Sequence, residues 1–331
     1  MKALSDFYSG KEILLLGGTG SLGKALLKKI QDEQLHAKGV RIFSRDEYKQ
    51  WLMKKDFGDD RVSYLIGDVR DKERLRRAFT GVDIVINCAA MKHVGACELN
   101  PIEAVQTNID GAKNIIEAAL DCNVKRVLHV STDKAVYPVN LYGATKAVAE
   151  KLFLDSTVYK GGNYSTIFSC VRYGNVFGSR GSLVERILKI TSGQDFGPIP
   201  LTDERMTRFF ITLDSVTDFI LERVASMESG KIYVPEMSSI KIKRLIEILA
   251  PGIETYDIGM QQGEKLHECI VSKDEVSRSI LVNGVKSAFV EIGKERKVKF
   301  YDSLEDVTSE NCDELKEEKI LNWKNMMIEN Q

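Results

Sequence analysis

The sequence predicts an α/β fold: a Rossmann-like, doubly wound parallel sheet joined to a smaller C-terminal substrate-binding domain. Three observations predict it. Short apolar strands alternate with helical segments through the first half of the chain. The first strand runs into a glycine-rich turn and then a helix. Each polar motif of this half follows the end of a strand, and ligands of such sheets bind at the carboxyl ends of the strands.

The composition limits the class of protein. The 331 residues suffice for one large domain with a smaller partner, and 43% hydrophobic with 29% charged residues is an ordinary globular balance. A net charge of -1 without a basic run argues against nucleic-acid binding. The six cysteines form no C-x-x-C pair, the N-terminus lacks an apolar targeting core, and no apolar run nears the roughly 18 residues of a membrane span. We therefore expect a cytoplasmic protein with reduced thiols and no membrane partner.

The glycine-rich turn predicts a dinucleotide site. It follows a strand at 12–16, has G-x-x-G-x-x-G spacing, and opens a helix expected at 21–34. Such glycines let the backbone approach a pyrophosphate, and the helix N-terminus supplies N–H groups and a partial positive charge. A plain turn with a helix cap is the alternative. The residues of this turn that we expect to bind the cofactor are Gly17, Thr19, Gly20, Ser21, Leu22 and Gly23.

The end of the second strand, expected at 40–43, predicts which dinucleotide binds. An NAD site places an acidic residue here, on the ribose hydroxyls. In this chain Ser44 and Arg45 come first, then Asp46, with Lys49 close behind. Because two cations suit a 2′-phosphate, the predicted cofactor is NADP. The alternative is that Asp46 holds the ribose and Arg45 is a solvated charge.

The next two strand ends complete the predicted cofactor site. After the strand at 62–66, Asp68 and Val69 are expected near the adenine ring, with Asp68 as a cap of the following helix as the alternative. After the strand at 82–86, Ala89 is small enough for a flat cofactor to lie against it.

Lys92 and His93 follow this segment. Lys92 is expected to face the pocket and hold a phosphate or sugar, with a plain surface lysine as the alternative. His93 has no other ligand at metal-binding spacing, so no metal site is predicted.

The most informative stretch follows a buried strand at 124–130. Asp133 and Lys134 are adjacent just past its end, and a helix expected at 141–159 carries Tyr142 and Lys146 on one face. A cation beside a phenol favours the ionised phenol, so this second pair predicts proton transfer. Asp133 and Lys134 form either a further acid–base pair or a loop ion pair.

The second half of the chain loses the strict alternation. Arg205 and Arg208 are predicted either to clamp a diphosphate or to form ion pairs within the fold. The other elements expected are helices at 108–121, 213–227 and 241–249, strands at 166–171 and 231–234, and a loop over the site at 193–200. The predicted domains are a cofactor-binding domain at 1–175 joined by 208–234, a substrate-binding domain at 176–207 and 235–302, and a polar surface extension at 303–331.

Together these motifs resemble the extended short-chain dehydrogenase/reductase family. Within it, the chain is similar to the inverting UDP-N-acetylglucosamine 4,6-dehydratases of the pseudaminic acid pathway. The resemblance spans about residues 17 to 271, and the similar motifs are those at 17–21, 43–47, 66–71, 92–94, 131–135, 140–146, 171–176 and 263–268.

The resemblance implies a UDP-sugar substrate and a homo-oligomer, either a dimer or a hexamer. It also implies three chemical stages. Carbon 4 of the sugar is oxidised by NADP⁺ while Tyr142 takes the hydroxyl proton, helped by Lys146. Water then leaves across carbons 5 and 6, with Lys134 as base and Asp133 as acid, and the hydride returns to carbon 6.

The resemblance also adds Thr132 to the catalytic set and places Tyr142 and Lys146 against the cofactor. The substrate-binding residues predicted on this basis are Lys92, Ser131, Thr132, Asn175, Thr202, Arg205 and Glu264.

Two departures from the family pattern are visible. Relatives carry Arg-Pro before the Gly-Glu-Lys turn, where this chain has Gln261 and Gln262, so the diphosphate contact differs. The C-terminal segment differs as well. The alternative functions are a retaining 4,6-dehydratase, a nucleotide-sugar 4-epimerase and a non-catalytic NADP-binding scaffold. The intact Tyr142 and Lys146, together with the Asp133-Lys134 pair, favour the inverting dehydratase.

Overall fold

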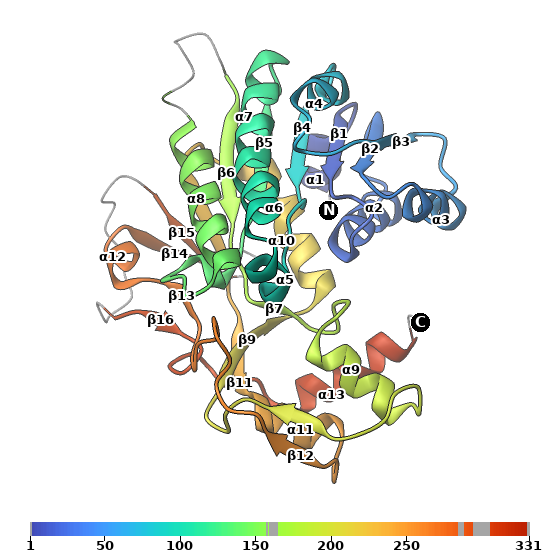
Figure 1. Ribbon diagram of the computed structural model, residues 1–331. Coiled ribbons are helices and arrows are strands. Elements are labelled where there is room, and N and C mark those ends of the chain that lie inside the picture. Colours follow the sequence, from blue (N-terminus) through green and yellow to red (C-terminus); the bar gives the residue numbers. More distant parts are fainter. Residues whose placement is uncertain (1, 157, 159–164, 284–287, 294–304, 330–331) are drawn as a thin grey trace.

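The computed structural model describes residues 2–156, 158, 165–283, 288–293 and 305–329. It has a large lobe around a central sheet and a smaller lobe beneath it (Figure 1). Within the described residues the central sheet has nine strands. In chain order they are β1 (Glu12–Leu16), β2 (Gly39–Ser44), β3 (Val62–Ile66), β4 (Ile84–Asn87), β5 (Arg126–Val130), β6 (Ile167–Val171), β10 (Lys231–Pro235), β14 (Ser279–Asn283) and β15 (Ala288–Ile292).

The order of these strands confirms the predicted doubly wound sheet. It is β3-β2-β1-β4-β5-β6-β10-β15-β14, and all neighbours from β3 to β10 pair in parallel. The order reverses between β1 and β4, which is the point where such sheets bind ligands. β1 and β4 are apolar and almost wholly buried, as expected of strands with helices on both faces of the sheet.

Two layers of helices cover the sheet. One layer contains α1 (Lys2–Tyr8), α2 (Ser21–Asp32) and α10 (Leu213–Ser226), and the other contains α4 (Lys72–Phe79), α7 (Gly111–Asp121) and α8 (Leu141–Asp155). α3 (Glu47–Phe57) packs beside β2 and β3. The short segments are α5 (Val94–Leu99), α6 (Pro101–Val105) and the π-helical turn η1 (Gln106–Asp110) before α7, and the 3-10 turn η2 (Asp133–Ala135) before α8.

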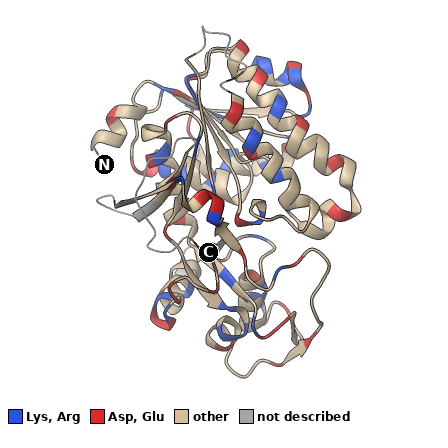
Figure 2. Cartoon of the chain, turned by 90° about the vertical axis from the view of Figure 1, so that its left-hand side faces the viewer, with Lys and Arg blue, Asp and Glu red and all other residues tan. Residues whose placement is uncertain are grey.

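Residues of both charges are interspersed along the helices of the large lobe (Figure 2). Between α4 and α7, for example, Lys72 Nζ lies 2.6 Å from Glu117 Oε2. Exposed pairs of this kind contribute little to stability individually. The large lobe is therefore stabilised mainly by the apolar core between its sheet and its helices.

The smaller lobe has its own apolar core. Its sheet contains β7 (Asn175–Val176), β9 (Thr207–Ile211) and β11 (Ser238–Lys241), and β8 (Ile199–Leu201) pairs with β12 (Thr255–Asp257). Its helices are α9 (Leu183–Thr191), α11 (Ile242–Leu249) and α13 (Glu317–Glu329). Ile187, Leu245 and Leu249 are fully buried between these elements. Between the lobes, β13 (Cys269–Val271) pairs with β16 (Val307–Thr308) and is followed by α12 (Lys273–Val276).

The structure corrects the organisation expected for the end of the chain. β14 and β15, which the sequence analysis placed in the substrate-binding domain, extend the central sheet as antiparallel strands. The described part of 303–331 is not a simple surface extension, because Leu315 and Ile320 are buried in the core of the smaller lobe. The segment is acidic overall, so its sequence shows no apolar run, and the few apolar side chains that it buries are isolated ones.

The helix ends also differ from expectation in detail. α2 ends at Asp32 rather than at residue 34, and α8 ends at Asp155. The rest of the range predicted for α8 lies partly outside the described residues. Its N-terminus is at Leu141 as predicted, and this end positions the functional side chains.

Candidate active site

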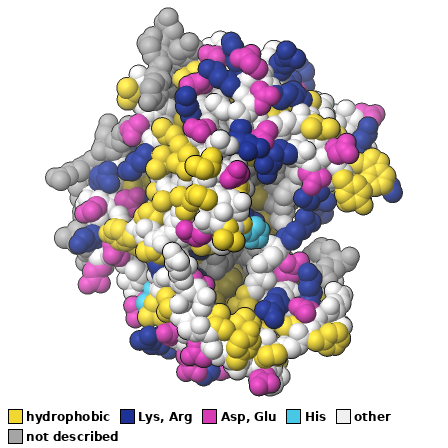
Figure 3. Space-filling view, viewed as in Figure 1, with side chains coloured by type: hydrophobic (Ala, Val, Ile, Leu, Met, Phe, Trp, Pro, Cys, Tyr) yellow, Lys and Arg dark blue, Asp and Glu magenta, His cyan; other side chains and the backbone are white. Residues whose placement is uncertain are grey.

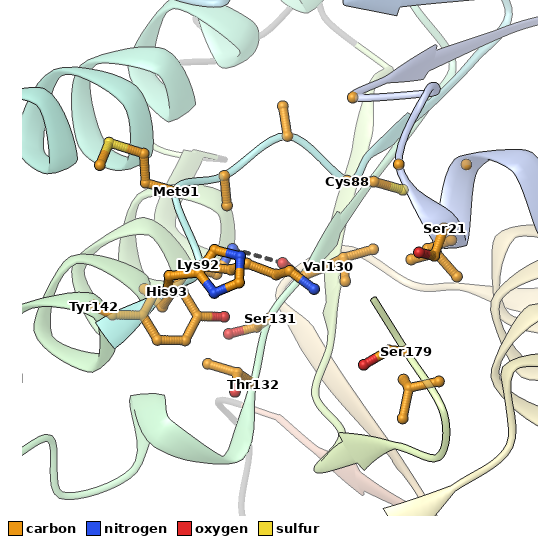
Figure 4. A pocket seen from close by; sticks show the side chains of 18 of the residues that line it. Ser21, Cys88, Met91, Lys92, His93, Val130, Ser131, Thr132, Tyr142 and Ser179 are labelled. Atoms are coloured by element: carbon orange, nitrogen blue, oxygen red, sulfur yellow. Dashed lines mark hydrogen bonds between the residues drawn. The ribbon is translucent and has the colours of Figure 1, made fainter. Parts of the chain in front are cut away.

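A cavity of about 780 Å³ lies at the switch point of the central sheet, between the two lobes. Figure 3 shows the hollow on the surface, and Figure 4 shows side chains around it. The segments after β1, β2, β4, β5 and β6 all line the cavity, through Gly17, Arg45, Cys88, Ser131 and Tyr173 respectively. The cavity therefore lies at the carboxyl ends of the parallel strands, where the sequence predicted the site.

The glycine-rich turn presents backbone groups to this cavity. Gly17 has a φ of +69°, and a Cβ there would lie 2.8 Å from the backbone nitrogen of Ala89, so only glycine fits. Gly20 is the N-cap of α2, and no side chain caps the first N–H groups of that helix. These N–H groups and the positive end of the helix dipole remain available for an anion. The turn therefore fits the pyrophosphate of a dinucleotide.

The residues after β2 bear on the two predicted ways of binding the ribose, by Arg45 with Lys49 or by Asp46. Asp46 caps α3, because its Oδ1 accepts the N–H of Lys49 at 2.9 Å and its Oδ2 lies 2.6 Å from Lys49 Nζ. These bonds lower the pKa of Asp46. The side chain of Arg45 is 60% exposed, with its Nη1 3.8 Å from Asp68 Oδ2. Asp46 is thus bound to its own helix, whereas Arg45 is open to a ligand.

Asp68 is not the cap of the following helix. Asp71 caps α4 by accepting the N–H of Arg74, while Asp68 pairs with Arg70 at 2.6 Å. All the residues predicted to bind the cofactor line the cavity, namely Gly17, Thr19, Gly20, Ser21, Leu22, Gly23, Ser44, Arg45, Asp46, Lys49, Asp68, Val69, Ala89, Tyr142 and Lys146.

The segment after β5 is held tightly against the start of α8. Asn140 caps α8 by accepting the N–H of Gly143 at 2.7 Å, and its Nδ2 donates to the carbonyl of Gly263 at 2.7 Å. A Cβ at Gly143 would overlap the carbonyl oxygen of Lys134. Glycine at this position therefore lets α8 approach the loop, which brings Tyr142 close to Lys134.

Asp133 and Lys134 form a buried ion pair beside the cavity. Lys134 Nζ donates to Asp133 Oδ1 at 3.1 Å, and Thr132 Oγ1 donates to the same oxygen at 3.0 Å. Glu268 Oε1 lies 3.5 Å from Lys134 Nζ, so one ammonium group faces two carboxylates. Burial disfavours the charge on Lys134, but Asp133 and Glu268 outweigh it and raise the pKa of Lys134.

Tyr142 lies near this pair rather than against Lys146. Burial raises the pKa of Tyr142 to about 12, and the groups that oppose this rise are the Lys134 ammonium and the Thr132 hydroxyl. In Figure 4 its hydroxyl points toward Ser131. The sequence analysis expected Lys146 to be the cation acting on the phenol. In the structure, Lys134 has that effect.

Lys146 lies against the inner wall of the cavity. It is only 2% exposed, its Nζ donates to the carbonyl of Val130 at 2.6 Å, and it lies 2.8 Å from His129 Nε2. Burial lowers its pKa to about 8. No carboxylate of the described chain forms an ion pair with it.

The predicted substrate-binding residues divide into two groups. Lys92, Ser131, Thr132 and Asn175 line the cavity. Burial and the nearby Arg180 lower the pKa of Lys92, which therefore faces a positively charged neighbour. Among the residues lining the cavity, Thr202, Arg205 and Glu264 do not occur.

The two arginines expected near a diphosphate are bound within the fold. Arg205 is exposed, and its Nη2 lies 2.8 Å from Asp203 Oδ2. Arg208 is buried and donates to the carbonyls of Thr207, Lys265 and Leu266. These contacts support the second alternative, that of ion pairs and hydrogen bonds within the fold.

One other expectation for the smaller lobe, a loop over the site at 193–200, is not met by the structure. Residues 193–200 do not line the cavity, and the last of them begin β8, which pairs with β12. Gln261, which replaces a family arginine, is exposed, and its amide donates to the carbonyls of Ile258 and Gly259 at 3.0 Å.

Glu268 and Lys265 contribute to the site although the sequence analysis gave them no role. Lys265 Nζ lies 3.4 Å from Glu268 Oε2 and donates to the carbonyl of Val136 at 2.6 Å. Both belong to the Gly-Glu-Lys-Leu-His-Glu motif. The acidic and basic residues that lie close together in this motif were the sequence feature that could have predicted their role. His129 was also missed, because it looked like one polar residue in an apolar strand.

The described residues contain no group of three or more His, Cys, Asp or Glu side chains arranged to hold a metal ion. Nor does this part of the chain contain a helix with both the length and the apolar character needed to cross a membrane.

The sequence of this chain is similar to those of known nucleotide-sugar enzymes. The family model described as "Polysaccharide biosynthesis protein" matches residues 13–288. The inverting UDP-N-acetylglucosamine 4,6-dehydratase of Campylobacter jejuni subsp. jejuni serotype O:23/36 is 47% identical over 268 residues, covering 81% of this chain and 79% of that protein. The UDP-glucose 4-epimerase of Rickettsia akari is 35% identical over 330 residues, covering 95% of each protein.

A solved structure matches over nearly the whole chain. The X-ray structure of Pen from Bacillus thuringiensis superposes with a TM-score of 0.86 at 35% identity, covering 96% of this chain and 99% of that one. The resemblance drawn from the sequence motifs is confirmed by these matches. The chain therefore belongs to the polysaccharide biosynthesis protein family, as an enzyme with the short-chain dehydrogenase/reductase fold.

Proposed function

We propose that this protein is a C5-inverting UDP-N-acetylglucosamine 4,6-dehydratase that uses NADP. Its product would be UDP-2-acetamido-2,6-dideoxy-β-L-arabino-hex-4-ulose. The observation that carries the proposal is the buried Asp133–Lys134 pair close to Tyr142. Redox chemistry at one alcohol needs only the tyrosine, whereas elimination of water needs an additional acid and base. The 47% identity to the Campylobacter jejuni dehydratase supports the choice of substrate.

The cofactor site supports NADP. The turn from Gly17 to Gly23 would hold the pyrophosphate, and Arg45 with Lys49 would hold the 2′-phosphate. Asp46 is engaged as a helix cap, which argues against its binding the ribose hydroxyls. When bound, the nicotinamide ring supplies a reversible hydride acceptor. Tyr142 and Lys146 line the same cavity, and we expect both of them beside this ring.

The side chains then have distinct proton roles. Tyr142 accepts the proton of the 4-hydroxyl, and Lys134 and Thr132 favour the ionised phenol. The ketone at carbon 4 acidifies the hydrogen on carbon 5. Lys134 removes that hydrogen as a proton, and Asp133 protonates the hydroxyl that leaves carbon 6.

The raised pKa of Lys134 sets a condition on this assignment. Lys134 starts as an ammonium beside a carboxylate. Transfer of one proton along the 3.1 Å bond from Nζ to Asp133 Oδ1 converts the pair into an amine and a carboxylic acid. Those are the base and the acid that elimination needs. The transfer leaves the net charge of the buried pair unchanged, which suits a site of low dielectric constant.

Proton NMR of the protein with NADP⁺ and UDP-N-acetylglucosamine in D₂O tests the proposal. We expect a 4-keto-6-deoxy product of L-arabino configuration with deuterium at carbon 5. In Lys134→Ala, water loss should fall by roughly 10²- to 10⁴-fold, the usual contribution of a general base, while oxidation at carbon 4 can persist. A product with retained D-configuration would identify a retaining dehydratase, and normal turnover of Lys134→Ala would remove Lys134 from its role.

A 4-epimerase is the second candidate, favoured by the 35% identity to the Rickettsia akari epimerase over 95% of the chain. Epimerisation needs oxidation and reduction at carbon 4 but no acid–base pair for elimination. The same NMR experiment distinguishes the two, because a 4-epimer without any keto sugar contradicts the dehydratase.

The proposal extends to a homo-oligomer acting in the cytoplasm on the way to pseudaminic acid. Leu99 on α5 is 84% exposed and Ile102 on α6 is 62% exposed, and large exposed apolar side chains mark interfaces. Light scattering after size-exclusion chromatography would measure the assembly. A monomer at micromolar concentration would contradict this part.

A further inference from the structure

A buried histidine that the proposed mechanism does not use lies behind Lys146, which lines the cavity. His129, on β5, is 1% exposed and stacks on Phe153 with ring centroids 4.4 Å apart. Its two ring nitrogens have different partners: Nδ1 lies 2.9 Å from Asn87 Nδ2, and Nε2 lies 2.8 Å from Lys146 Nζ. Each of these bonds has a direction that the surrounding contacts determine.

The direction follows from Asn87. Its Oδ1 accepts the backbone N–H of Ala89 at 3.1 Å, so its Nδ2 is the group that faces the imidazole. An amide nitrogen can only donate, and His129 Nδ1 must therefore accept. Burial, with Lys146 nearby, lowers the pKa of His129 well below its usual value, so the ring is neutral. A neutral imidazole that accepts at Nδ1 carries its proton on Nε2.

That proton points at Lys146. An N–H can donate to Lys146 Nζ only if the nitrogen has a lone pair, which the amine has and the ammonium lacks. One N–H of Lys146 then donates to the carbonyl of Val130 at 2.6 Å. These hydrogen bonds form a series from Ala89 through Asn87 and His129 to Lys146. Every donor in the series has an acceptor only when Lys146 is neutral.

We propose that His129 is a positioning residue that favours the neutral, proton-accepting amine of Lys146 over its ammonium by donating Nε2–H to Lys146 Nζ. The other titratable groups facing Lys146, namely Cys170, Glu150 and Cys88, oppose the lowering of its pKa, but burial outweighs them. Glu150 on the same helix is paired with Arg172 at 2.7 Å, and burial raises the pKa of the Cys88 and Cys170 thiols, so both stay neutral.

A neutral Lys146 changes the start of the reaction, and this consequence rests on the proposed function. Tyr142 begins as a phenol, because burial raises its pKa to about 12. When Tyr142 takes the proton of the 4-hydroxyl, its own proton needs an acceptor. Lys146 lines the same cavity, and its amine can accept this proton through a hydroxyl group or water molecule between the two side chains, so that an N–H bond forms at Lys146 as the phenol O–H bond breaks.

The hydrogen-bond direction can be tested without substrate or cofactor. The chain has four histidines, so long-range ¹H–¹⁵N spectra of the full-length protein labelled at the imidazole nitrogens are simple to assign, with His129→Phe removing one set. At pH 9, above the pKa of about 8 of Lys146, we expect His129 as the neutral Nε2–H tautomer. An Nδ1–H tautomer or an imidazolium would overturn the proposal.

The effect on Lys146 is measured by titrating the ¹³Cε signals of labelled lysine, with Lys146→Met for assignment. Replacing His129 by Phe removes the donor, and replacing it by Gln can offer an acceptor to the ammonium. Both variants should raise the titration midpoint of Lys146, by about one pH unit. Phe153→Leu is the matched control, because it removes the stacked ring but keeps the donor, and its midpoint should not move.

A purely structural role for His129 would lower stability without moving this midpoint, and an unchanged midpoint in His129→Gln would overturn the proposal. The spectra remain informative if the enzyme proves to act on another sugar, since neither measurement needs turnover. If the dehydratase activity is found, the acid limb of the pH profile for carbon 4 oxidation should move in the same direction as the midpoint.

Discussion

Lys134 and Lys146 line the same cavity, lie in one loop–helix unit and are both largely buried. Their pKa values are nevertheless shifted in opposite directions from the ordinary value of a lysine. Lys134 faces Asp133 at 3.1 Å and Glu268 at 3.5 Å, and its pKa is raised. Lys146 faces a carbonyl and an imidazole, and its pKa falls to about 8.

The difference shows that the partner, rather than burial, decides the charge of a buried lysine. Burial disfavours the ammonium in both cases. Two carboxylates reverse that preference, and a neutral hydrogen-bond donor does not. One cavity therefore holds a lysine that starts as an acid and a lysine that can start as a base. Four substitutions test this contrast, in order of expected size.

Lys134→Met should have the largest effect on stability. It leaves Asp133 and Glu268 buried without their shared cation, and breaking a buried ion pair costs about 3–5 kcal/mol. Lys265, 3.4 Å from Glu268, should keep the loss near the lower limit. Urea unfolding at pH 7 measures it, with the exposed Lys151→Met on α8 as control. A variant as stable as the parent would show that the pair contributes nothing.

Lys146→Met should act in the opposite direction. The folded pKa of about 8 lies below the ordinary 10.5, so the folded state binds the proton less well than the unfolded chain. This penalty is fully present below pH 8, is worth about 3 kcal/mol, and disappears as the pH rises to 10.5.

The methionine variant should therefore be more stable than the parent at pH 7, by about 1–3 kcal/mol after the lost hydrogen bonds are counted. Its advantage should shrink between pH 8 and 10.5 in urea unfolding experiments. An advantage that stays constant over this range would mean that packing, and not the charge of Lys146, is the cause.

Glu268→Gln should reduce the difference between the pKa values of Lys134 and Lys146 without abolishing it. The Lys134 ammonium then faces one carboxylate, so its pKa falls, although Asp133, the stronger of the two partners, remains. The pH profile of water loss from the sugar should therefore move to lower pH. Glu310→Gln, an exposed carboxylate near His267, is the control and should leave the profile in place. A shift to higher pH would contradict the assignment of Lys134 as base.

Arg45→Ala should have the smallest effect and should leave both lysines unchanged, because Arg45 follows β2, away from the loop and helix that carry them. We expect the preference for NADP over NAD to fall about tenfold, or roughly 1.4 kcal/mol. Dissociation constants for the two cofactors, from titration of the protein's fluorescence, measure this. Equal losses for both cofactors would assign Arg45 to a general contact instead of the 2′-phosphate.

The contrast between the two lysines also shows which features of the site could be predicted from the sequence and which could not. The glycine-rich turn, the strand ends and the Asp133-Lys134 pair follow from local order, because a strand, a tight turn and a helix fix which backbone groups face the ligand. Lys146 was placed on the right helix face but given the wrong neighbour. Its side chain is long, and neighbouring residues along α8 do not determine which way it turns.

The sequence by itself determined the fold class, the cofactor turn and the family, since each depends on short segments with characteristic spacing. Only the tertiary structure decided the charges inside the cavity. Glu268 reaches Lys134 from a distant turn, and His129 reaches Lys146 from the neighbouring strand. Burial strengthens each of these contacts by removing water. Partners far apart in the chain therefore set the proton positions on which the chemistry depends.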